Sequence, residues 1–586
     1  MNTEWSLKEF YTGLDDPAYE ADIARAEEKI KELEAFVKTA ENLSWKEIAE
    51  GGLTLREEIE ELLDKPGYYL SLRQSVESEN GDIVAQLNRV MKLAADLTPF
   101  DTALDKLLAK IPDVDALGEE SELVREYNFY LKEIQKNAAH LLSDEVEEMA
   151  AAMNMTAGSA WSRLQAYMTS TVEVDYDGEK VTLPEIRNLA YSPDAKVRKA
   201  AYEAELAAYE KIKDPIAFSI NNIKNQVTML CHKRGYESPL AMTLEQSRMK
   251  RETLDALMEA IREYLPVFRK YMRRKGELLG HADGLPWYDL FAPLGKADKT
   301  YTIEEARDYL LEVFEKFSPD MSDLMRDAFD KEWIDFYPRK GKEGGAFCAG
   351  ISQCRQSRIL TNYDGTFSSI RTLAHELGHA FHNRQKEDGR ILNQSYTMPV
   401  AETASTFNEV HLGQAALANA SSEERLSLLE HELREYNQTI VDIYSRYLFE
   451  TAVFEKSQGK FLMAGDLNRL MLDAQKEAYG DGLDERTLHP YMWACKSHYY
   501  RETLSFYNFP YAFGNLFALG LYAMFKKEGD AFVVKYEAML KATPCCTIEE
   551  AGAMMGVDVT NKAFWEGSLS EIAQKVEEFC AAASVL

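Results

Sequence analysis

Cysteine, basic residues and long apolar runs are all scarce in this sequence. Only 7 of its 586 residues are cysteine, and no two of them form a CxxC pair, so the spacing fits neither a disulfide framework nor a cysteine-type zinc site. Free thiols in a reducing compartment are the better interpretation. The most apolar stretch, residues 511–525, is shorter than the roughly 20 residues that a membrane span needs, and the first residues lack a signal-peptide pattern. We therefore expect a soluble, cytoplasmic protein with no membrane partner.

The shortage of positive charge excludes further classes of protein. The chain has 67 Lys and Arg against 98 Asp and Glu, which gives a formal net charge of −31. Because phosphate recognition depends on a surplus of Lys and Arg, we expect no nucleic-acid partner. The same charge disfavours adsorption to an anionic membrane surface. With 46% hydrophobic and 11% aromatic residues, the chain can nevertheless bury a large core and is not a disordered acidic segment.

Strand signals are also few, and helical signals dominate. Start signals are present: Thr302 with Glu305 forms a capping box, and Ser192 followed by proline is typical of a helix N-cap. Apolar residues recur at intervals of three or four, as on one face of an amphipathic helix, in the stretches 23–37, 123–142, 196–206, 254–278 and 426–447. The sequence predicts a mostly α fold.

Two short β regions are the exceptions. Asp177-Gly178, placed between two β-like stretches, predicts a tight hairpin. A second pair of candidate strands, residues 346–351 and 358–361, lies shortly before the motif described next. No linker or repeat marks a domain boundary. The least disruptive division lies near the hairpin and gives an N-terminal helical domain of residues 1–190 and a larger domain of residues 191–586.

One motif carries chemistry. Residues 375–379 read His-Glu-Leu-Gly-His, within a stretch that has an apolar helical face. His375 and His379 are four residues apart, so both rings project from one face, roughly 6 Å apart at their bases. That separation suits two imidazoles on one tetrahedral zinc ion. Glu376 points away from the pair but can reach a water beside the metal, which is why this pattern indicates a metal site with a general base.

The motif needs a third ligand, because a catalytic zinc ion takes three protein ligands and keeps one position open. A second helix can begin at Pro399, and it would carry two carboxylates seven residues apart. An aspartate closer in sequence and a histidine two turns after His375 are further candidates. The residue types alone leave four alternatives open: Glu402, Glu409, Asp388 and His382.

Longer segments resemble a known family. HELGHAFH followed by VAETASTFNE is similar to the thimet oligopeptidase and oligoendopeptidase F family of zinc metallopeptidases, and more so to the oligoendopeptidase F branch. Residues 4–23 and 489–515 resemble that branch as well. The resemblance implies one Zn²⁺ per chain with Glu402 as its third ligand beside His375 and His379. It also implies that His382 is not a ligand and that Glu409 occupies a position that can orient a zinc-binding histidine.

The family's C-terminal segment supplies hydrogen-bond donors to the reacting carbonyl. The matching residues are His498, Tyr507 and Tyr511, and a phenol suits this task because it is neutral at pH 7. Many members have a further tyrosine where this chain has Phe509. The resemblance also implies an elongated, multi-helical molecule of the zincin type, in which the N-terminal domain walls a deep substrate channel. The β-like segment 344–351 would lie beside the zinc helix and could pair with an extended peptide.

The resulting hypothesis is a zinc-dependent endopeptidase that hydrolyses internal bonds of short oligopeptides. Glu376 accepts the proton of the attacking water and passes it to the leaving amine. The alternatives are a zinc-binding, non-hydrolytic peptide-binding protein, an aminopeptidase-type metallohydrolase, and a helical scaffold for protein partners in which the histidines are incidental.

Overall fold

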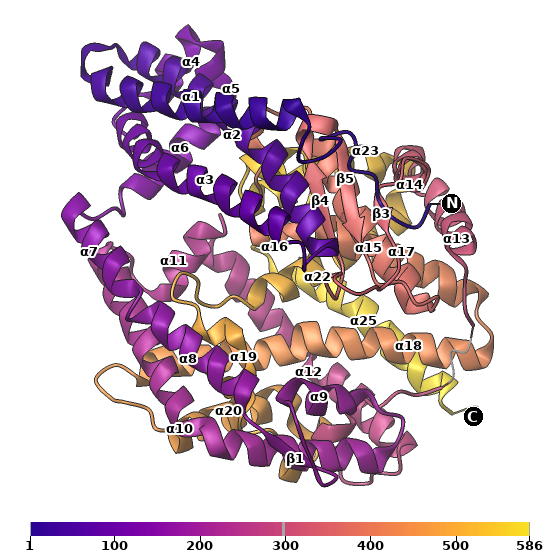
Figure 1. The fold of residues 1–586 in the computed structure, drawn as a ribbon. Coiled ribbons are helices and arrows are strands. Elements are labelled where there is room, and N and C mark those ends of the chain that lie inside the picture. Colours follow the sequence, from indigo (N-terminus) through magenta and orange to yellow (C-terminus); the bar gives the residue numbers. More distant parts are fainter. Residues whose placement is uncertain (1, 296–298, 585–586) are drawn as a thin grey trace.

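The structure is a computed structural model, and it describes residues 2–295 and 299–584. The N-terminal helices form an upper lobe, and α7 and α8 descend along one side of the molecule to a lower lobe (Figure 1). The first eight helices are α1 (Pro17–Thr39), α2 (Trp45–Val76), α3 (Gly81–Leu108), α4 (Val114–Glu120), α5 (Glu122–Glu126), α6 (Asn128–Ala138), α7 (Asp144–Asn154) and α8 (Gly158–Thr171).

The lower lobe contains a hairpin and the longest helix. Strands β1 (Val174–Tyr176) and β2 (Glu179–Val181) pair antiparallel, and the turn residues Asp177 and Gly178 both have positive φ, 51° and 82°. Such a pair is what a two-residue hairpin turn requires, so the predicted hairpin is confirmed. The following elements are α9 (Leu183–Asn188), α10 (Ala195–Lys233), α11 (Pro239–Gln246), α12 (Arg251–Leu278), α13 (Ile303–Glu315) and α14 (Pro319–Asp330).

A small three-stranded sheet precedes the motif helix. Its strands are β3 (Ile334–Asp335), β4 (Phe347–Ile351) and β5 (Gln356–Leu360), in the order β3-β5-β4. β5 is parallel to β3 and antiparallel to β4, so β4 is an edge strand. The sequence predicted β4 and β5, whereas the two-residue β3 was missed because it is too short to show an alternating pattern.

The remaining helices follow the small sheet. They are α15 (Phe367–Lys386), α16 (Met398–Ala401), α17 (Thr403–Asn419), α18 (Ser422–Tyr436), α19 (Ile443–Lys456), α20 (Ala464–Tyr479), α21 (Met492–Cys495), α22 (Phe509–Glu528), α23 (Asp530–Ala542), α24 (Ile548–Met554) and α25 (Lys562–Ala582). The apolar stretch 511–525 lies within α22, whose side chains are largely buried. Of the helices in the described part of the chain, none is both long and apolar enough to cross a membrane.

Several helix boundaries differ from the sequence prediction. The capping box of Thr302 and Glu305 is present at α13, but α10 is capped by Asp194 and not by Ser192. The predicted helix at 426–447 is interrupted by a π-helical segment, Asn437–Asp442, between α18 and α19. π-helical turns are rare in proteins, and those that occur are often found at functional sites.

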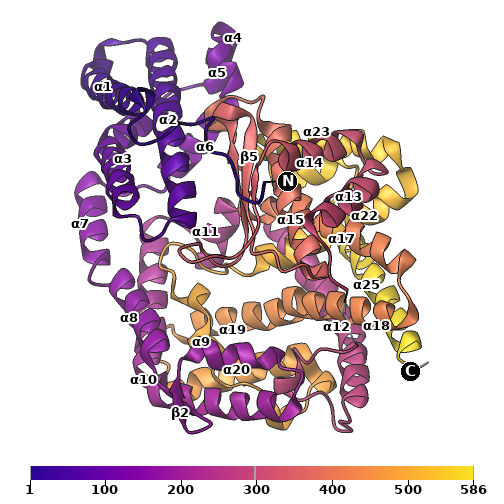
Figure 2. The ribbon, with the colours of Figure 1, turned by 45° about the vertical axis from the view of Figure 1, so that its right-hand side comes forward.

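The buried apolar side chains form three clusters. The largest collects residues from Val174 to Ala583, and a second lies within residues 26–134 of the upper lobe. The third joins the N-terminal segment to the small sheet, because Trp5 and Tyr69 pack in the same cluster as Ile351 and Leu360. Figure 2 shows α1 and α3 of the upper lobe set apart from α15, α17 and α22, which lie on the other side of the molecule. The division of the chain near residue 190 stays a prediction.

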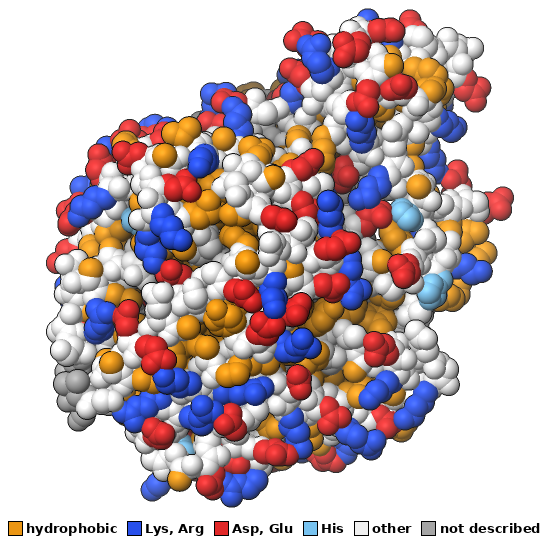
Figure 3. All heavy atoms as spheres, turned by 180° about the vertical axis from the view of Figure 1, so that it is seen from behind, with side chains coloured by type: hydrophobic (Ala, Val, Ile, Leu, Met, Phe, Trp, Pro, Cys, Tyr) orange, Lys and Arg blue, Asp and Glu red, His pale blue; other side chains and the backbone are white. Residues whose placement is uncertain are grey.

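The surface carries charges of both signs. On the face shown in Figure 3, acidic and basic side chains are interspersed, with apolar side chains between them. The net charge of −31 is therefore not gathered into one acidic patch on this face.

Candidate metal centre and active site

The motif helix α15 is anchored by its apolar face and by a close approach to its neighbour. Ile370, Leu373 and Leu377 are fully buried, and the Thr366 side chain caps the helix by accepting a hydrogen bond from the Ser369 amide. At Gly378, an added Cβ would lie only 2.6 Å from the Ala404 carbonyl oxygen. The absence of a side chain at this position therefore lets the start of α17 lie directly against α15.

The backbone breaks where the third candidate ligand lies. Glu402 lies between the end of α16 and the start of α17, with φ −90° and ψ 4°. The Ser405 hydroxyl donates a hydrogen bond of 2.8 Å to the Glu402 carboxylate, and an added Cβ at Gly514 of α22 would lie 3.3 Å from the Glu402 Cβ. Glu402 is thus held from two sides, and its carboxylate faces the two motif histidines.

Three potential ligand atoms form a nearly equilateral triangle. His375 Nε2 lies 3.2 Å from His379 Nε2, and Glu402 Oε2 lies 3.3 Å from His375 Nε2 and 3.4 Å from His379 Nε2. Ligands about 2.0–2.1 Å from a tetrahedral zinc ion are about 3.3–3.4 Å from one another. The two imidazoles and the carboxylate therefore match three corners of a zinc coordination shell and leave the fourth free. Within residues 2–295 and 299–584 no other group of three or more His, Cys, Asp and Glu is as compact.

Glu376 is buried beside this triangle. Its side chain is 5% exposed, and its Oε2 atom has no hydrogen-bond partner among the described residues. Burial raises the pKa of Glu376, and the neighbouring His375 and His379 partly offset the increase. A buried carboxylate oxygen without a partner is costly, and a water molecule at the free corner of the metal site would satisfy it. The environment of Glu376 therefore fits both a metal ion and a base that accepts a proton from water.

Glu409 supports the triangle from behind. Its Oε1 lies 2.5 Å from His375 Nδ1, and its Oε2 accepts a 2.6 Å hydrogen bond from Arg371. Although burial opposes the effect, Arg371 and His375 lower the pKa of Glu409 to about 2. Glu409 is therefore charged and holds the Nδ1 proton of His375, which turns the Nε2 lone pair toward the centre of the triangle.

The other two candidates lie outside the triangle. His382 is fully buried, its ring stacks on Tyr396 at 4.1 Å, and its Nε2 lies 2.7 Å from the Thr543 hydroxyl. Burial lowers the pKa of His382 to about 3. Asp388 is exposed and forms an ion pair with Arg355 at 2.8 Å. Neither side chain is among the three that the structure brings together.

The predicted oxyanion donors form a chain of contacts. Tyr511, at the start of α22, lines a cavity of 220 Å³ together with His375 and Glu402. Its hydroxyl lies 3.4 Å from the Tyr507 hydroxyl, and the Tyr507 ring stacks on His498 at 4.6 Å. Burial and the contact with Tyr507 raise the pKa of Tyr511, so its hydroxyl keeps its proton. Tyr511 therefore shares a cavity with two residues of the triangle, and Tyr507 and His498 follow it in the chain of contacts.

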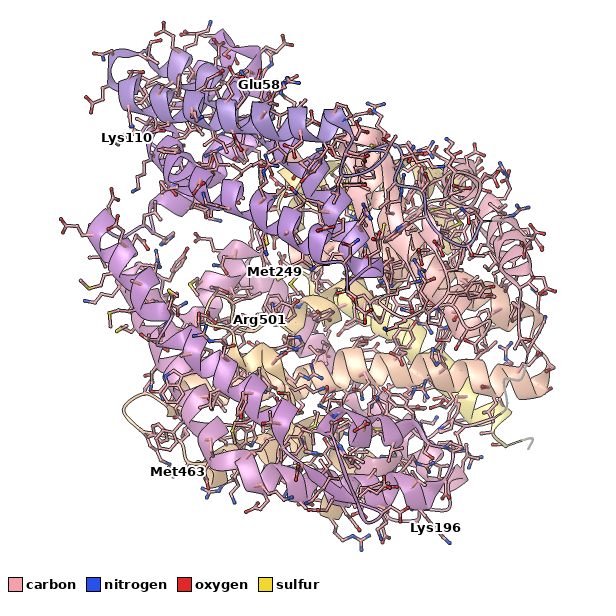
Figure 4. All side chains as sticks on the ribbon, viewed as in Figure 1. Glu58, Lys110, Lys196, Met249, Met463 and Arg501 are labelled. Carbon is pink, nitrogen blue, oxygen red and sulfur yellow. The ribbon has the colours of Figure 1, made fainter. Side chains whose placement is uncertain are left out.

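The segment before α22 is fixed by ring packing. Phe506 has a positive φ of 52°, which is strained for a bulky residue, and its ring is held between Tyr447 and Phe454. Arg501 lies over the Tyr507 ring at 4.4 Å, and Figure 4 shows it in the middle of the molecule, between the upper and lower lobes. Burial, together with the cations Arg446, Arg501 and Lys496, lowers the pKa of His498 to about 4, so this imidazole is neutral at pH 7.

Two supporting residues were missed from the sequence. Arg371, one turn before His375 on α15, positions Glu409, and Ser405 positions Glu402. The spacing of four residues between Arg371 and His375 was a possible signal, but an arginine on a helix usually faces solvent. The role of Ser405 depends on the break at Glu402, which the sequence does not show.

The helical fold and the compact His-His-Glu site beside a buried glutamate are those of a metallopeptidase. A model of peptidase family M3 matches residues 188–571, and a model described as oligopeptidase F matches residues 109–173. The chain belongs to peptidase family M3.

Relatives and solved structures agree with this assignment. The chain is 27% identical over 469 residues to the oligopeptidase PepF of Bacillus subtilis, which covers 78% of this chain and 69% of that protein. It is 24% identical over 596 residues to an oligoendopeptidase F homolog of Borreliella burgdorferi, covering 98% of each. The fold matches a crystal structure titled as a putative peptidase from Chlamydophila abortus, with a TM-score of 0.86, 21% identity and coverage of 99% and 98%. The resemblance to the oligoendopeptidase F family and the mostly helical fold are thereby confirmed.

Proposed function

We propose that this metallopeptidase binds one Zn²⁺ through His375, His379 and Glu402 and hydrolyses internal bonds of short oligopeptides. The observation that carries the proposal is the triangle of ligand atoms with edges of 3.2–3.4 Å. A zinc ion bound there would lower the pKa of a water molecule from about 15.7 towards 7 and polarise the scissile carbonyl. Relatives named oligopeptidase and oligoendopeptidase F support peptides as the substrate class.

Glu376 and Tyr511 have separate tasks in the proposed reaction. The Glu376 carboxylate, whose Oε2 has no other partner among the described residues, accepts a proton from the attacking water and then passes it to the leaving amine. The Tyr511 hydroxyl donates a hydrogen bond to the oxygen that becomes negative in the transition state. Tyr507 and the neutral His498 hold that hydroxyl in place, and no covalent acyl-enzyme forms.

The edge strand β4 supports binding of an extended peptide. It pairs only with β5 within the described sheet, so its other edge is available for main-chain hydrogen bonds to a substrate. Main-chain pairing gives affinity without strong dependence on side chains. The N-terminal domain of residues 1–190 would wall the substrate channel from the opposite side, and the oligomeric state does not enter this proposal.

A cytoplasmic location remains part of the proposal. All seven cysteines lie within the described residues, and all are free thiols, as is usual in a reducing compartment.

Product mapping tests the proposed activity. Peptides with blocked N-termini are incubated with the enzyme, and the products are identified by mass spectrometry. We expect cleavage at internal bonds, with rates that fall as the substrate is lengthened towards a folded protein. Cleavage restricted to unblocked N-termini would identify an aminopeptidase instead, and binding without any products would identify a non-hydrolytic peptide-binding protein.

Replacement of Tyr511 tests the oxyanion donor. In Tyr511→Phe the ring remains but the donor is lost, so we expect kcat to fall about 100- to 1,000-fold with KM nearly unchanged. The matched control is Tyr522→Phe, which removes a hydroxyl from the same helix, outside the cavity that contains the triangle. Equal kcat values for Tyr511→Phe and the unchanged enzyme would remove Tyr511 from the mechanism.

A further inference from the structure

A second, larger cavity lies next to the candidate active site. Its volume is 570 Å³, within the range of about 300–1,000 Å³ that is usual for small-molecule sites. It is bounded by α9, by the first part of α10 and by the π-helical segment, and one wall is aromatic. The aromatic wall consists of Tyr191, Tyr202, Trp287, Tyr288 and Phe291. The proposed reaction assigns no task to this cavity.

One residue is shared by this cavity and the catalytic one, and a second lies near the predicted oxyanion donors. Glu435, at the end of α18, lines both cavities. Lys496 lines the larger cavity and lies close enough to His498 for its charge to help lower the pKa of that imidazole. The two cavities therefore adjoin each other along the end of α18 and the π-helical segment.

Lys496 is a cation in this cavity without a direct partner in the described part of the chain. No hydrogen bond or ion pair of its ammonium group is found among the described residues. Burial and the nearby Arg446 lower its pKa, and the attraction of Asp442 offsets only part of that decrease, so the charge is incompletely compensated. Because a buried cation gains most from an anion that arrives with the ligand, Lys496 marks one end of the cavity as a site for negative charge.

The carboxylates around the cavity are already engaged. Asp442 is paired with Arg446, and Glu205 lies 3.4 Å from Arg187. Glu435 has an ion pair with Arg434 at 3.8 Å. None of these acids lies within ion-pair distance of Lys496, although Asp442 is near enough for the charge of Lys496 to lower its pKa. A substrate carboxylate can therefore still supply a direct partner for Lys496.

We propose that the larger cavity binds the C-terminal part of the oligopeptide substrate and that Lys496 forms an ion pair with its terminal carboxylate. This inference rests on the proposed peptidase function. Every unblocked oligopeptide has one such carboxylate, so Lys496 provides recognition that is independent of sequence. The distance from the triangle of ligand atoms to Lys496 then favours cleavage at a set number of residues from the C-terminus.

The test compares pairs of otherwise identical substrates. Each N-terminally blocked, internally quenched peptide is prepared with a free C-terminal carboxylate and as its carboxamide. The unchanged enzyme is expected to prefer the free acid by about 10- to 100-fold in kcat/KM, mainly through KM. In Lys496→Met this preference should disappear, whereas Lys496→Arg should keep most of it. The preference is the ratio of the two kcat/KM values within each variant, so a general change in rate caused by the substitution cancels. Circular dichroism and the melting temperature show whether both variants are folded.

The matched control is Lys527→Met, which removes the same charge from the exposed end of α22 and should leave the preference unchanged. A second pair of carboxamides carries Glu or Gln near the C-terminus. A Lys496-dependent preference for Glu in that pair, without one for the free terminus, would overturn the assignment to the terminal carboxylate. An unaltered preference in Lys496→Met would do the same.

The two proposals fail in different ways. If the enzyme cleaves neither member of any pair, the peptidase function is wrong. If it cleaves both members equally well, the peptidase function stands and the role of Lys496 is wrong. Product masses provide a further readout, since loss of the ion pair in Lys496→Met should broaden the set of cleaved bonds.

Discussion

Glu376→Gln is expected to reduce kcat/KM about 100- to 10,000-fold while the protein retains its zinc. Glutamine has the size and shape of glutamate but accepts a proton far less readily, so the variant isolates proton transfer from packing. Glu376 is outside the triangle of ligand atoms, and for this reason its replacement should leave metal binding intact. Peptide hydrolysis is measured by the fluorescence of an internally quenched substrate, and zinc by elemental analysis of the same sample.

A matched substitution completes this experiment. Glu387, immediately after α15, has the same side chain but lies outside the catalytic cavity, so Glu387→Gln should retain full activity. If Glu376→Gln were as active as the unchanged enzyme, Glu376 would not be the proton acceptor. If the variant lost its zinc as well, its low activity would be explained by the missing metal. The zinc measurement therefore distinguishes loss of the metal from loss of proton transfer.

Removal of the metal is expected to have the second large effect. Treatment with a chelator should bring the zinc content from one ion per chain to nearly zero and hydrolysis below detection, and added Zn²⁺ should restore both. In Glu402→Ala the triangle loses one corner, so the affinity for zinc should fall by more than the roughly 10- to 100-fold loss that removal of a supporting residue produces. Zinc affinity is measured directly by competition with a chromogenic chelator, independently of activity.

Glu409→Ala provides the graded comparison. Glu409 orients His375 without joining the triangle, so its loss should weaken zinc binding within that roughly 10- to 100-fold range and leave the stoichiometry at one. Equal losses in Glu402→Ala and Glu409→Ala would contradict the assignment of Glu402 as the third ligand. A zinc content near zero in the unchanged protein would contradict the metal site as a whole.

The sequence predicted part of this site because part of it is local. His375 and His379 lie on one turn of one helix, so their spacing alone places them together. The third ligand is different: Glu402 and Glu409 are seven residues apart and would share a face of a continuous helix. In the structure the helix is interrupted at Glu402, and the two carboxylates reach the same histidine from different directions.

The remaining features depend on contacts between distant segments. The π-helical segment Asn437–Asp442 interrupts a stretch whose apolar spacing predicts an ordinary helix. The larger cavity is built from residues of α9, α10 and the 492–496 region, and no pattern within any one of these segments indicates it. The start of a helix can also be misplaced when two capping residues lie close together. Asp194 caps α10, and the predicted cap Ser192 does not.

The close contact at Gly378 shows that a residue inside the motif also controls the position of the third ligand. In the general pattern His-Glu-x-x-His, the two middle positions carry no ligand and are written as interchangeable. Here the second of them is Gly378. A Cβ added to it would lie 2.6 Å from the carbonyl oxygen of Ala404, in the backbone that follows Glu402. A side chain at that position would push the third ligand away from the first two. In this fold, fewer residues are therefore tolerated at the second middle position than the general pattern allows. The glycine there sets how closely α15 and α17 can approach each other.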